Sequence, residues 1–258
     1  MTIAILSVIA AMIFYLLLIL PTQWLKVEHV HYWTGIQLRA LQISDIHVER
    51  LRISPRRLSE VIEEANPDVI FLTGDFTQKS RHLPAVRRYI QRICLAGIPV
   101  YAVLGNHDHR LNASGLAKLL EIMESFGVRV LNNESVDLGD YQLVGIDDYG
   151  SEKSRVEDAF KQVTSDKPII VLTHNPNIVL DPLMKRPYTY LMAGHLHGMQ
   201  FHIPFLFRFV NKGKLVADGI YQGLHRTDYG SYYISKGIGQ AGPNARFLVR
   251  SEVTIHEL

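Results

Sequence analysis

Short apolar runs alternate with helical patterns along most of this chain, and that alternation constrains its fold more than any other feature. Predicted strands cover Gln37–Ser44, Val69–Thr73, Val100–Leu104, Tyr141–Ile146, Pro168–Thr173 and Thr189–Ala193. Predicted helices cover Pro55–Ala65, Leu83–Leu95, Ser114–Ser125 and Glu152–Val163. Ser54 is the expected N-cap of the first helix, because a proline follows it at the first helical position. Apolar strands separated by helices indicate a layered α/β fold.

Side chains that can bind metal ions follow five of the six predicted strands. The candidates are Asp45, His47, Asp75, Asn106, His107, Asp108, His174, His195 and His197. In open α/β sheets, sites form in the crevice at the carboxyl ends of the strands. One such residue after one strand would mean little, but five strands in succession deliver them. We therefore expect these side chains to meet at one edge of the fold.

The spacing of these residues has a physical explanation. In an extended segment, residues two apart point the same way, so Asp45 and His47 can hold one ion, and the same reasoning applies to His195 and His197. Glycines at positions 74, 105 and 194 allow sharp turns and a close approach of the backbone to a ligand. A mixture of imidazole and carboxylate ligands suits Mn, Fe, Zn or Co better than Mg or Ca.

The five motifs, in this order, resemble the pattern of the calcineurin-like metallophosphoesterases, from about Gln37 to the C-terminus. The resemblance implies a four-layer α/β/β/α sandwich with two divalent metal ions, manganese being favoured. It assigns Asp45, His47 and His197 to one ion, Asn106, His174 and His195 to the other, and Asp75 to both. It implies that His107 polarises a phosphate oxygen or protonates the leaving group, and that Asp108 orients His107. No position of the core pattern is missing.

The charges at such a centre suit a phosphate ester. Two divalent ions and the carboxylates of Asp45 and Asp75 leave about two positive charges to attract a phosphodiester or phosphate dianion. Asn106 adds an oxygen ligand without adding negative charge. Metal-bound water ionises near pH ~7, so a nucleophile is available without a side-chain base. The predicted reaction is hydrolysis of a phosphodiester or pyrophosphate.

Two further segments resemble a membrane-associated branch of that family, the YkuE/YaeI-like enzymes. Residues 145–148, Gly-Ile-Asp-Asp, match one of its signatures; a turn with solvated carboxylates is the alternative. The C-terminal Gly- and Tyr-rich run resembles the same branch, with His225 and Lys236 departing from its form. Met199–Lys214 carries four phenylalanines beside three cations. It is either buried β-structure or an apolar lip that contacts lipid, which suggests a lipid-linked substrate.

The other notable side chains carry simpler expectations. Histidines 109, 202 and 225 lie outside the motif pattern, and we expect His202 to be solvated rather than to face the substrate. Cys94, the single cysteine, lies in a predicted helix beside apolar neighbours and is expected in the core. A chain with one cysteine forms no internal disulfide, so the fold depends on its core.

The N-terminus predicts a membrane anchor. Ile3 to Leu20 is apolar and uncharged, and 18 helical residues span roughly 27 Å, close to the ~30 Å core of a bilayer. Pro21 is expected to end this helix, and no cleavage-site pattern follows it. We expect residues 1–25 to be a transmembrane anchor, 26–35 a linker and 36–258 the catalytic domain. Lys26 and Arg39 follow the helix, which favours a cytoplasmic catalytic domain.

Several rival functions remain open at this point. A phosphomonoesterase would use the same metal centre and differ only in access. A catalytically silent scaffold would need no general acid, so His107 argues against it. A nuclease is disfavoured, since a net charge of +2 gives no basic footprint for nucleic acid as an obligatory partner. The sequence leaves the oligomeric state open.

Overall fold

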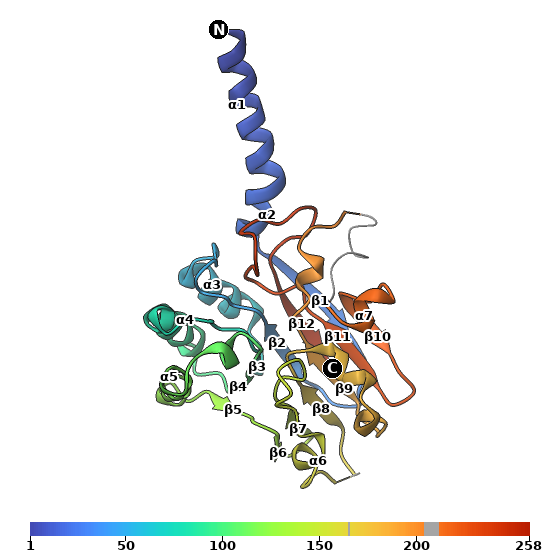
Figure 1. Cartoon of the computed structure of the whole chain (residues 1–258). Helices are drawn as coiled ribbons and strands as arrows, with labels where there is room; N and C mark the ends of the chain where they lie inside the picture. The colour runs from blue at the N-terminus through green and yellow to red at the C-terminus, as the bar shows by residue number, and fades with distance from the viewer. Residues whose placement is uncertain (165, 204–211) are drawn as a thin grey trace.

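The computed structural model describes residues 1–164, 166–203 and 212–258, and two six-stranded sheets form its centre (Figure 1). The first sheet has the order β1 (Lys26–His31), β12 (Glu252–Glu257), β2 (Arg39–Ile43), β3 (Val69–Thr73), β4 (Val100–Val103) and β5 (Arg129–Val130). The second has the order β10 (Gly223–Arg226), β11 (Ser231–Ile234), β9 (Tyr190–Ala193), β8 (Ile169–Leu172), β7 (Gln142–Gly145) and β6 (Glu134–Asp137). Strands β2, β3 and β4 run parallel to one another, as do β7, β8 and β9.

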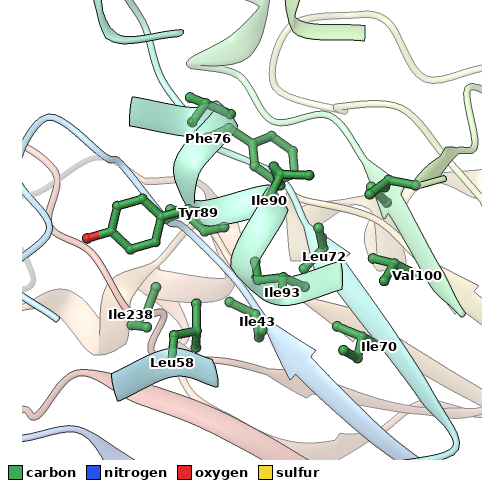
Figure 2. Close-up of a cluster of buried hydrophobic side chains, with 14 of the residues drawn as sticks. Ile43, Leu58, Ile70, Leu72, Phe76, Tyr89, Ile90, Ile93, Val100 and Ile238 are labelled. Atoms are coloured by element: carbon green, nitrogen blue, oxygen red, sulfur yellow. The ribbon is translucent and has the colours of Figure 1, made fainter. Parts of the chain in front are cut away.

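Helices cover the outer face of the first sheet. They are α3 (Pro55–Ala65), α4 (Leu83–Cys94) and α5 (Ala113–Ser125). Figure 2 shows how this layer packs: Leu58 of α3 and Ile90 and Ile93 of α4 lie against Ile43 and Leu72 of the sheet. The Ser54 side chain accepts a hydrogen bond from the Arg57 amide (3.1 Å), which confirms the predicted N-cap.

Apolar clusters on both sides of each sheet define four layers. Between the sheets, Phe71 of the first packs with Leu172 and Tyr190 of the second. The outer face of the second sheet packs against short helices, including α6 (Val156–Ala159), η4 (Pro176–Leu180) and α7 (Lys214–Ala217). The sequence prediction of an α/β/β/α sandwich is therefore confirmed.

Most predicted elements are present, and two expectations need correction. All six predicted strands exist. The first begins two residues later than predicted, at Arg39, and every other predicted strand end lies within one residue of the observed end. The predicted helix over 152–163 is wrong: only the single turn α6 forms, and Glu152 has a left-handed φ of 58° that interrupts a helix. The segment 26–35, predicted to be a linker, contains β1, which pairs in parallel with β12. Of the proposed apolar lip, residues 204–211 lie outside the described residues.

The N-terminal segment is one helix that projects away from the sandwich (Figure 1). It comprises α1 (Thr2–Phe14), a π-helical segment Tyr15–Ile19 and α2 (Leu20–Gln23). By length and composition it can cross a membrane. The helix continues two residues past Pro21, because α2 follows the π-helical segment directly.

The end of this helix is packed onto the sandwich. Thr22 is fully buried, and its carbonyl accepts a hydrogen bond from Ser251 Oγ (3.2 Å). The Arg246 amide donates to the Leu18 carbonyl (2.9 Å), and the Arg250 guanidinium lies 3.8 Å from the centre of the Trp24 ring. The helix and the sandwich are thus joined by specific contacts as well as by the chain.

Candidate metal centre

The predicted side chains gather where β2, β3, β4, β8 and β9 end. Three groups have ligand atoms within 4.8 Å of one another: Asp45 with His47 and His197, His47 with Asp75 and His107, and Asp75 with His174 and His195. Asp75 Oδ2 lies 3.3 Å from His47 Nε2 and 3.2 Å from His174 Nε2. A carboxylate shared between two groups in this way has the position needed to bridge two ions.

The two histidines of the last motif separate. His197 Nε2 lies 3.2 Å from Asp45 Oδ1, whereas His195 Nδ1 lies 3.2 Å from His174 Nε2. The sequence argument that residues two apart would hold one ion is therefore wrong for this pair. Its premise of an extended segment fails for both pairs, because His195 and His197 have φ of 71° and 54° and Asp45 and His47 have φ of 55° and 41°. The side chains of Asp45 and His47 nevertheless lie in one group.

Glycines make room for the carboxylates, as predicted. A Cβ on Gly105 would lie 2.3 Å from Asp75 Oδ1, and one on Gly194 would lie 2.3 Å from Asp45 Oδ2. Gly74 has φ +82°, and a Cβ there would lie 2.7 Å from the Gly105 amide nitrogen. Any side chain at these positions would displace a candidate ligand or its loop.

Asn106 meets a specific test of metal competence. It lines the same cavity as His195, and its buried Oδ1 has no hydrogen-bond partner within the described residues. A buried carbonyl oxygen without a partner is costly, and a cation would satisfy it. The donor set of carboxylates, imidazoles and one amide oxygen fits a pair of transition-metal ions.

Burial and the Asp75 charge set the protonation of the imidazoles. Burial lowers the pKa of His195 and His197 well below the usual range, which keeps both rings in the neutral form that binds metal. Burial also lowers the pKa of His47 and His174, but the Asp75 carboxylate outweighs it and raises both. Burial raises the pKa of Asp75, yet His174 and His47 bring it well below its usual value, so Asp75 is ionised.

Asp108 has different partners from those the sequence implied. Its carboxylate is fully buried and accepts hydrogen bonds from four backbone amides. Oδ2 accepts from Asp75 (2.9 Å) and Gly105 (2.9 Å), and Oδ1 accepts from Phe76 (2.9 Å) and Thr77 (3.1 Å). Asp108 therefore ties the β3 loop to the β4 loop, and its role in orienting His107 stays a prediction.

His107 is held by a residue that the motif analysis missed. Its Nδ1 lies 3.1 Å from Gln78 Oε1, which also accepts a hydrogen bond from Arg110 Nη1 (3.2 Å). The His107 amide donates to Asp75 Oδ1 (2.8 Å). Burial lowers the pKa of His107 to about 4. The only sequence signal for Gln78 was its position three residues after Asp75.

The Gly-Ile-Asp-Asp segment belongs to the surroundings of the centre. Asp147 Oδ1 lies 2.7 Å from His109 Nε2, and this contact raises the pKa of His109. Asp147 and Asp148 are both buried, so the alternative of a turn with solvated carboxylates is wrong. The pair of His109 and Asp147 joins the β4 loop to the β7 loop.

The other two histidines outside the pattern are partly buried. His202 contacts Tyr221, with its Nδ1 3.5 Å from the phenolic oxygen, and His225 Nε2 lies 2.8 Å from the Gln222 carbonyl. Cys94 is partly buried against the cluster of Figure 2, which agrees with the expected core position.

A C-terminal loop completes the centre from outside the five motifs. The Gly239 amide donates to the Asp45 carbonyl (2.8 Å), and the Gly239 carbonyl lies 3.2 Å from His197 Nδ1. A Cβ on Gly237 would lie 2.7 Å from Asp45 Cβ. The buried Arg246 guanidinium donates to the Gly237 carbonyl (3.0 Å). The glycine spacing of this segment was the available signal for its role.

Comparisons with known proteins agree with this geometry. The family model described as calcineurin-like phosphoesterase matches residues 38–199. The uncharacterized metallophosphoesterase YkoQ of Bacillus subtilis (strain 168) is 36% identical over 228 residues, covering 86% of this chain and 84% of the relative. Phosphodiesterase YaeI of Escherichia coli (strain K12) is 26% identical over 232 residues, covering 85% and 82%. A transmembrane protein with metallophosphoesterase domain from Danio rerio is 29% identical over 238 residues, covering 84% of this chain and 52% of the relative.

Proposed function

This chain belongs to the calcineurin-like phosphoesterase family, and we propose that it hydrolyses a phosphodiester or pyrophosphate bond of a membrane-associated substrate. The observation that carries the proposal is the position of Asp75 between two groups of metal-competent side chains. The relative named phosphodiesterase YaeI supports a diester as the substrate class.

The proposed ligand sets follow the three groups of side chains. One ion would be held by Asp45, His47 and His197, the other by Asn106, His174 and His195, and Asp75 would contact both. When bound, two divalent ions supply an ionised water at neutral pH and charge that stabilises the phosphoryl oxygens. We favour manganese on the ligand chemistry.

His107 has the position of a proton-handling residue beside these ligands. Its ring lies 4.7 Å from the His47 ring, centre to centre, and is partly exposed. With a pKa of about 4 the ring is neutral near pH 7, so it acts by hydrogen bonding to a phosphoryl or leaving-group oxygen. Gln78 and Arg110 fix the plane of the ring.

The topology supports a substrate at the membrane surface. Lys26, three residues after the helix, pairs with Glu252 at the start of β12. Strand β12 runs antiparallel to β2, so its start lies at the edge where β2 ends, beside Asp45. The Glu252 amide donates to Gly237, which also packs against Asp45. The helix and the metal ligands thus occupy the same end of the first sheet, as the view in Figure 1 indicates for α2.

The helix is proposed to remain attached as a transmembrane anchor. Removing it would leave the buried partners of Leu18, Pro21 and Thr22 unsatisfied on the sandwich. We also propose that the catalytic unit begins at Lys26, because β1 is part of the first sheet. Lys26 and Arg39, which follow the helix along the chain, favour a cytoplasmic location of the catalytic unit.

The decisive experiment uses the detergent-solubilised full chain supplied with Mn²⁺. We would measure hydrolysis of bis-p-nitrophenyl phosphate and p-nitrophenyl phosphate by wild type and Asp75→Asn. Asp137→Asn is the matched control, because Asp137 is an exposed carboxylate far from the centre that pairs with Lys167. We expect diester turnover that Asp75→Asn abolishes and Asp137→Asn preserves.

The other outcomes assign the rival functions. Turnover of the monoester alone would replace the proposal with a phosphomonoesterase. Two bound metals with no turnover of either ester would favour the silent scaffold. Equal activity in the Asp75→Asn variant would refute the metal mechanism altogether.

A further inference from the structure

A cavity of about 840 Å³ opens beside the candidate metal centre. Asn106 and His195 line it on the metal side, and Arg155, Lys212 and Lys214 bring cationic side chains to it. Glu152 is the one carboxylate among its described lining residues. This volume lies within the roughly 300–1,000 Å³ that ligand sites commonly enclose, and it far exceeds the volume of a single phosphoryl group. The cavity is large enough to hold a substantial part of the substrate next to the scissile bond.

Lys212 is the cation of this cavity that lies nearest the metal ligands. Its Nζ lies 3.4 Å from the His195 carbonyl oxygen, and it has no carboxylate within ion-pair distance among the described residues. Burial lowers the pKa of Lys212, while the charges of Asp45 and Asp75 oppose that effect. The ammonium group is therefore close enough to the centre to interact with the carboxylates that hold the metals.

The other two cations are already engaged elsewhere. Lys214 is exposed and pairs with Asp218 at 3.0 Å. Arg155 donates to the Glu152 carbonyl (3.1 Å) and the Ser154 carbonyl (2.8 Å). A partly buried ammonium without an anionic partner is unfavourable unless a ligand supplies one. Among the described cations of the cavity Lys212 alone has that need, because Arg155 and Lys214 are exposed to water, and the cavity gives an anion access to it.

The charge balance indicates what kind of anion fits. Two divalent ions with the carboxylates of Asp45 and Asp75 leave two positive charges, and Lys212 adds a third. A simple phosphodiester carries one negative charge and leaves most of this excess uncompensated. A diphosphate-linked diester carries two, with the second phosphoryl group adjacent to the first. Its second group would lie within the reach of a lysine beside His195.

We propose that Lys212 is a specificity-determining residue that binds a second phosphoryl group, so that the preferred substrates are diphosphate-bridged diesters. This inference rests on the proposed function and selects the pyrophosphate bond within it. Hydrolysis would add one water across the P–O–P bridge and release two phosphomonoesters, with no other reactant. The ammonium group would bind the phosphoryl group that leaves, through a charge-assisted hydrogen bond.

The test compares binding and turnover in the Mn²⁺-loaded full chain. Methylenediphosphonate, which is not hydrolysed, serves as the diphosphate probe in calorimetry, and methylphosphonate serves as the single-group probe. The variants are Lys212→Met and Lys212→Arg, with Lys118→Met as the control, because Lys118 is an exposed lysine that pairs with Glu121 and does not line the cavity. Metal content is measured in each variant to show that the centre is intact.

We expect Lys212→Met to weaken methylenediphosphonate binding about tenfold or more and to leave methylphosphonate binding within about twofold. Lys212→Arg should retain most of the binding, and Lys118→Met should match wild type. In turnover, Lys212→Met should lower kcat/KM for diadenosine 5′,5″-diphosphate by a similar factor and spare bis-p-nitrophenyl phosphate.

Two results would overturn the inference. Equal loss on both probes would show that Lys212 contacts the scissile phosphoryl group, and no loss on either would show that it contacts neither. The binding arm needs no turnover, so failure of the proposed hydrolysis is distinguishable: wild type would then bind methylenediphosphonate through Lys212 while hydrolysing no ester.

Discussion

Replacing Asp108 with asparagine distinguishes the role that the structure gives this residue from the role that the sequence implied. Each of the two carboxylate oxygens accepts hydrogen bonds from two backbone amides. In Asp108→Asn, one of these oxygens becomes an NH₂ group, which donates and cannot accept. Whichever way the amide is oriented, two buried N–H groups lose their acceptor and face another donor.

The expected cost follows from that count. A buried donor left without a partner costs about 1–3 kcal/mol, so two cost about 2–6 kcal/mol. Since whole domains are stable by about 5–15 kcal/mol, this loss is a large fraction of the total. We expect Asp108→Asn to unfold at clearly lower urea concentration than wild type, in metal-free protein as well as in metal-loaded protein.

The assay is urea unfolding of the detergent-solubilised full chain, followed by circular dichroism. Asp137→Asn is the control, because this exposed carboxylate pairs with Lys167 and should cost less than about 1 kcal/mol. If Asp108→Asn unfolds at the same urea concentration as wild type and loses only activity toward esters with poor leaving groups, the role of Asp108 in joining the β3 and β4 loops is refuted. The sequence interpretation, in which Asp108 acts through His107, would then be correct.

Four further predictions follow from groups around the core and the centre. Burial lowers the pKa of His256 to about 3, so between pH 6.5 and 3 this imidazole binds a proton only in the unfolded chain. The free energy of unfolding should therefore fall by up to ~1.4 kcal/mol per pH unit as pH falls through this range. Urea unfolding at pH 7 and pH 5 should show a smaller fall in His256→Gln. Burial raises the pKa of Cys94 to about 11, so alkylation by iodoacetamide at pH 8 should be roughly a hundredfold slower in folded protein than in urea. Because Asp75 raises the pKa of His174, metal binding should release protons and weaken as pH falls, which calorimetry in two buffers of different ionisation enthalpy would detect. His195 has φ 71°, so metal-free His195→Gly should be about 1 kcal/mol more stable than His195→Ala; the opposite order, usual in regular structure, would contradict strain at this position.

The sequence predicts the metal-binding edge well because strand ends are local features. Apolar runs such as Val69–Thr73 mark the strands, and the residues that follow each run can only lie at its carboxyl end. The five motifs therefore meet without any knowledge of the sheet order. The same locality explains why α3 was predicted to the residue, since a cap and a proline mark its start.

Features that depend on long-range pairing were not predictable in this way. Strand β12 lies between β1 and β2 although it comes from the other end of the chain, so residues 26–31 carried no sign that a partner existed. Gly239 reaches His197 through the same return of the C-terminus. The partners of Asp108 were unpredictable for another reason: they are backbone amides, which leave no signature in the sequence.

The backbone of the centre is strained, and the distribution of strain indicates what the fold is organised to do. Five of the seven proposed ligands have left-handed φ values between 41° and 71°: Asp45, His47, Asp75, His195 and His197. Such conformations cost roughly 1–2 kcal/mol for most residues, and glycine would avoid the cost. Glycine cannot bind a metal, so the chain places glycines at neighbouring positions, where they make room, and keeps side chains at the strained ones. The rest of the sandwich must hold these loops in place. The four hydrogen bonds to Asp108 and the contact of Arg246 with the C-terminal loop do so. Arg246 also donates to the anchor helix at Leu18, so the contacts that hold the strained ligands extend without interruption to the segment proposed to lie in the membrane.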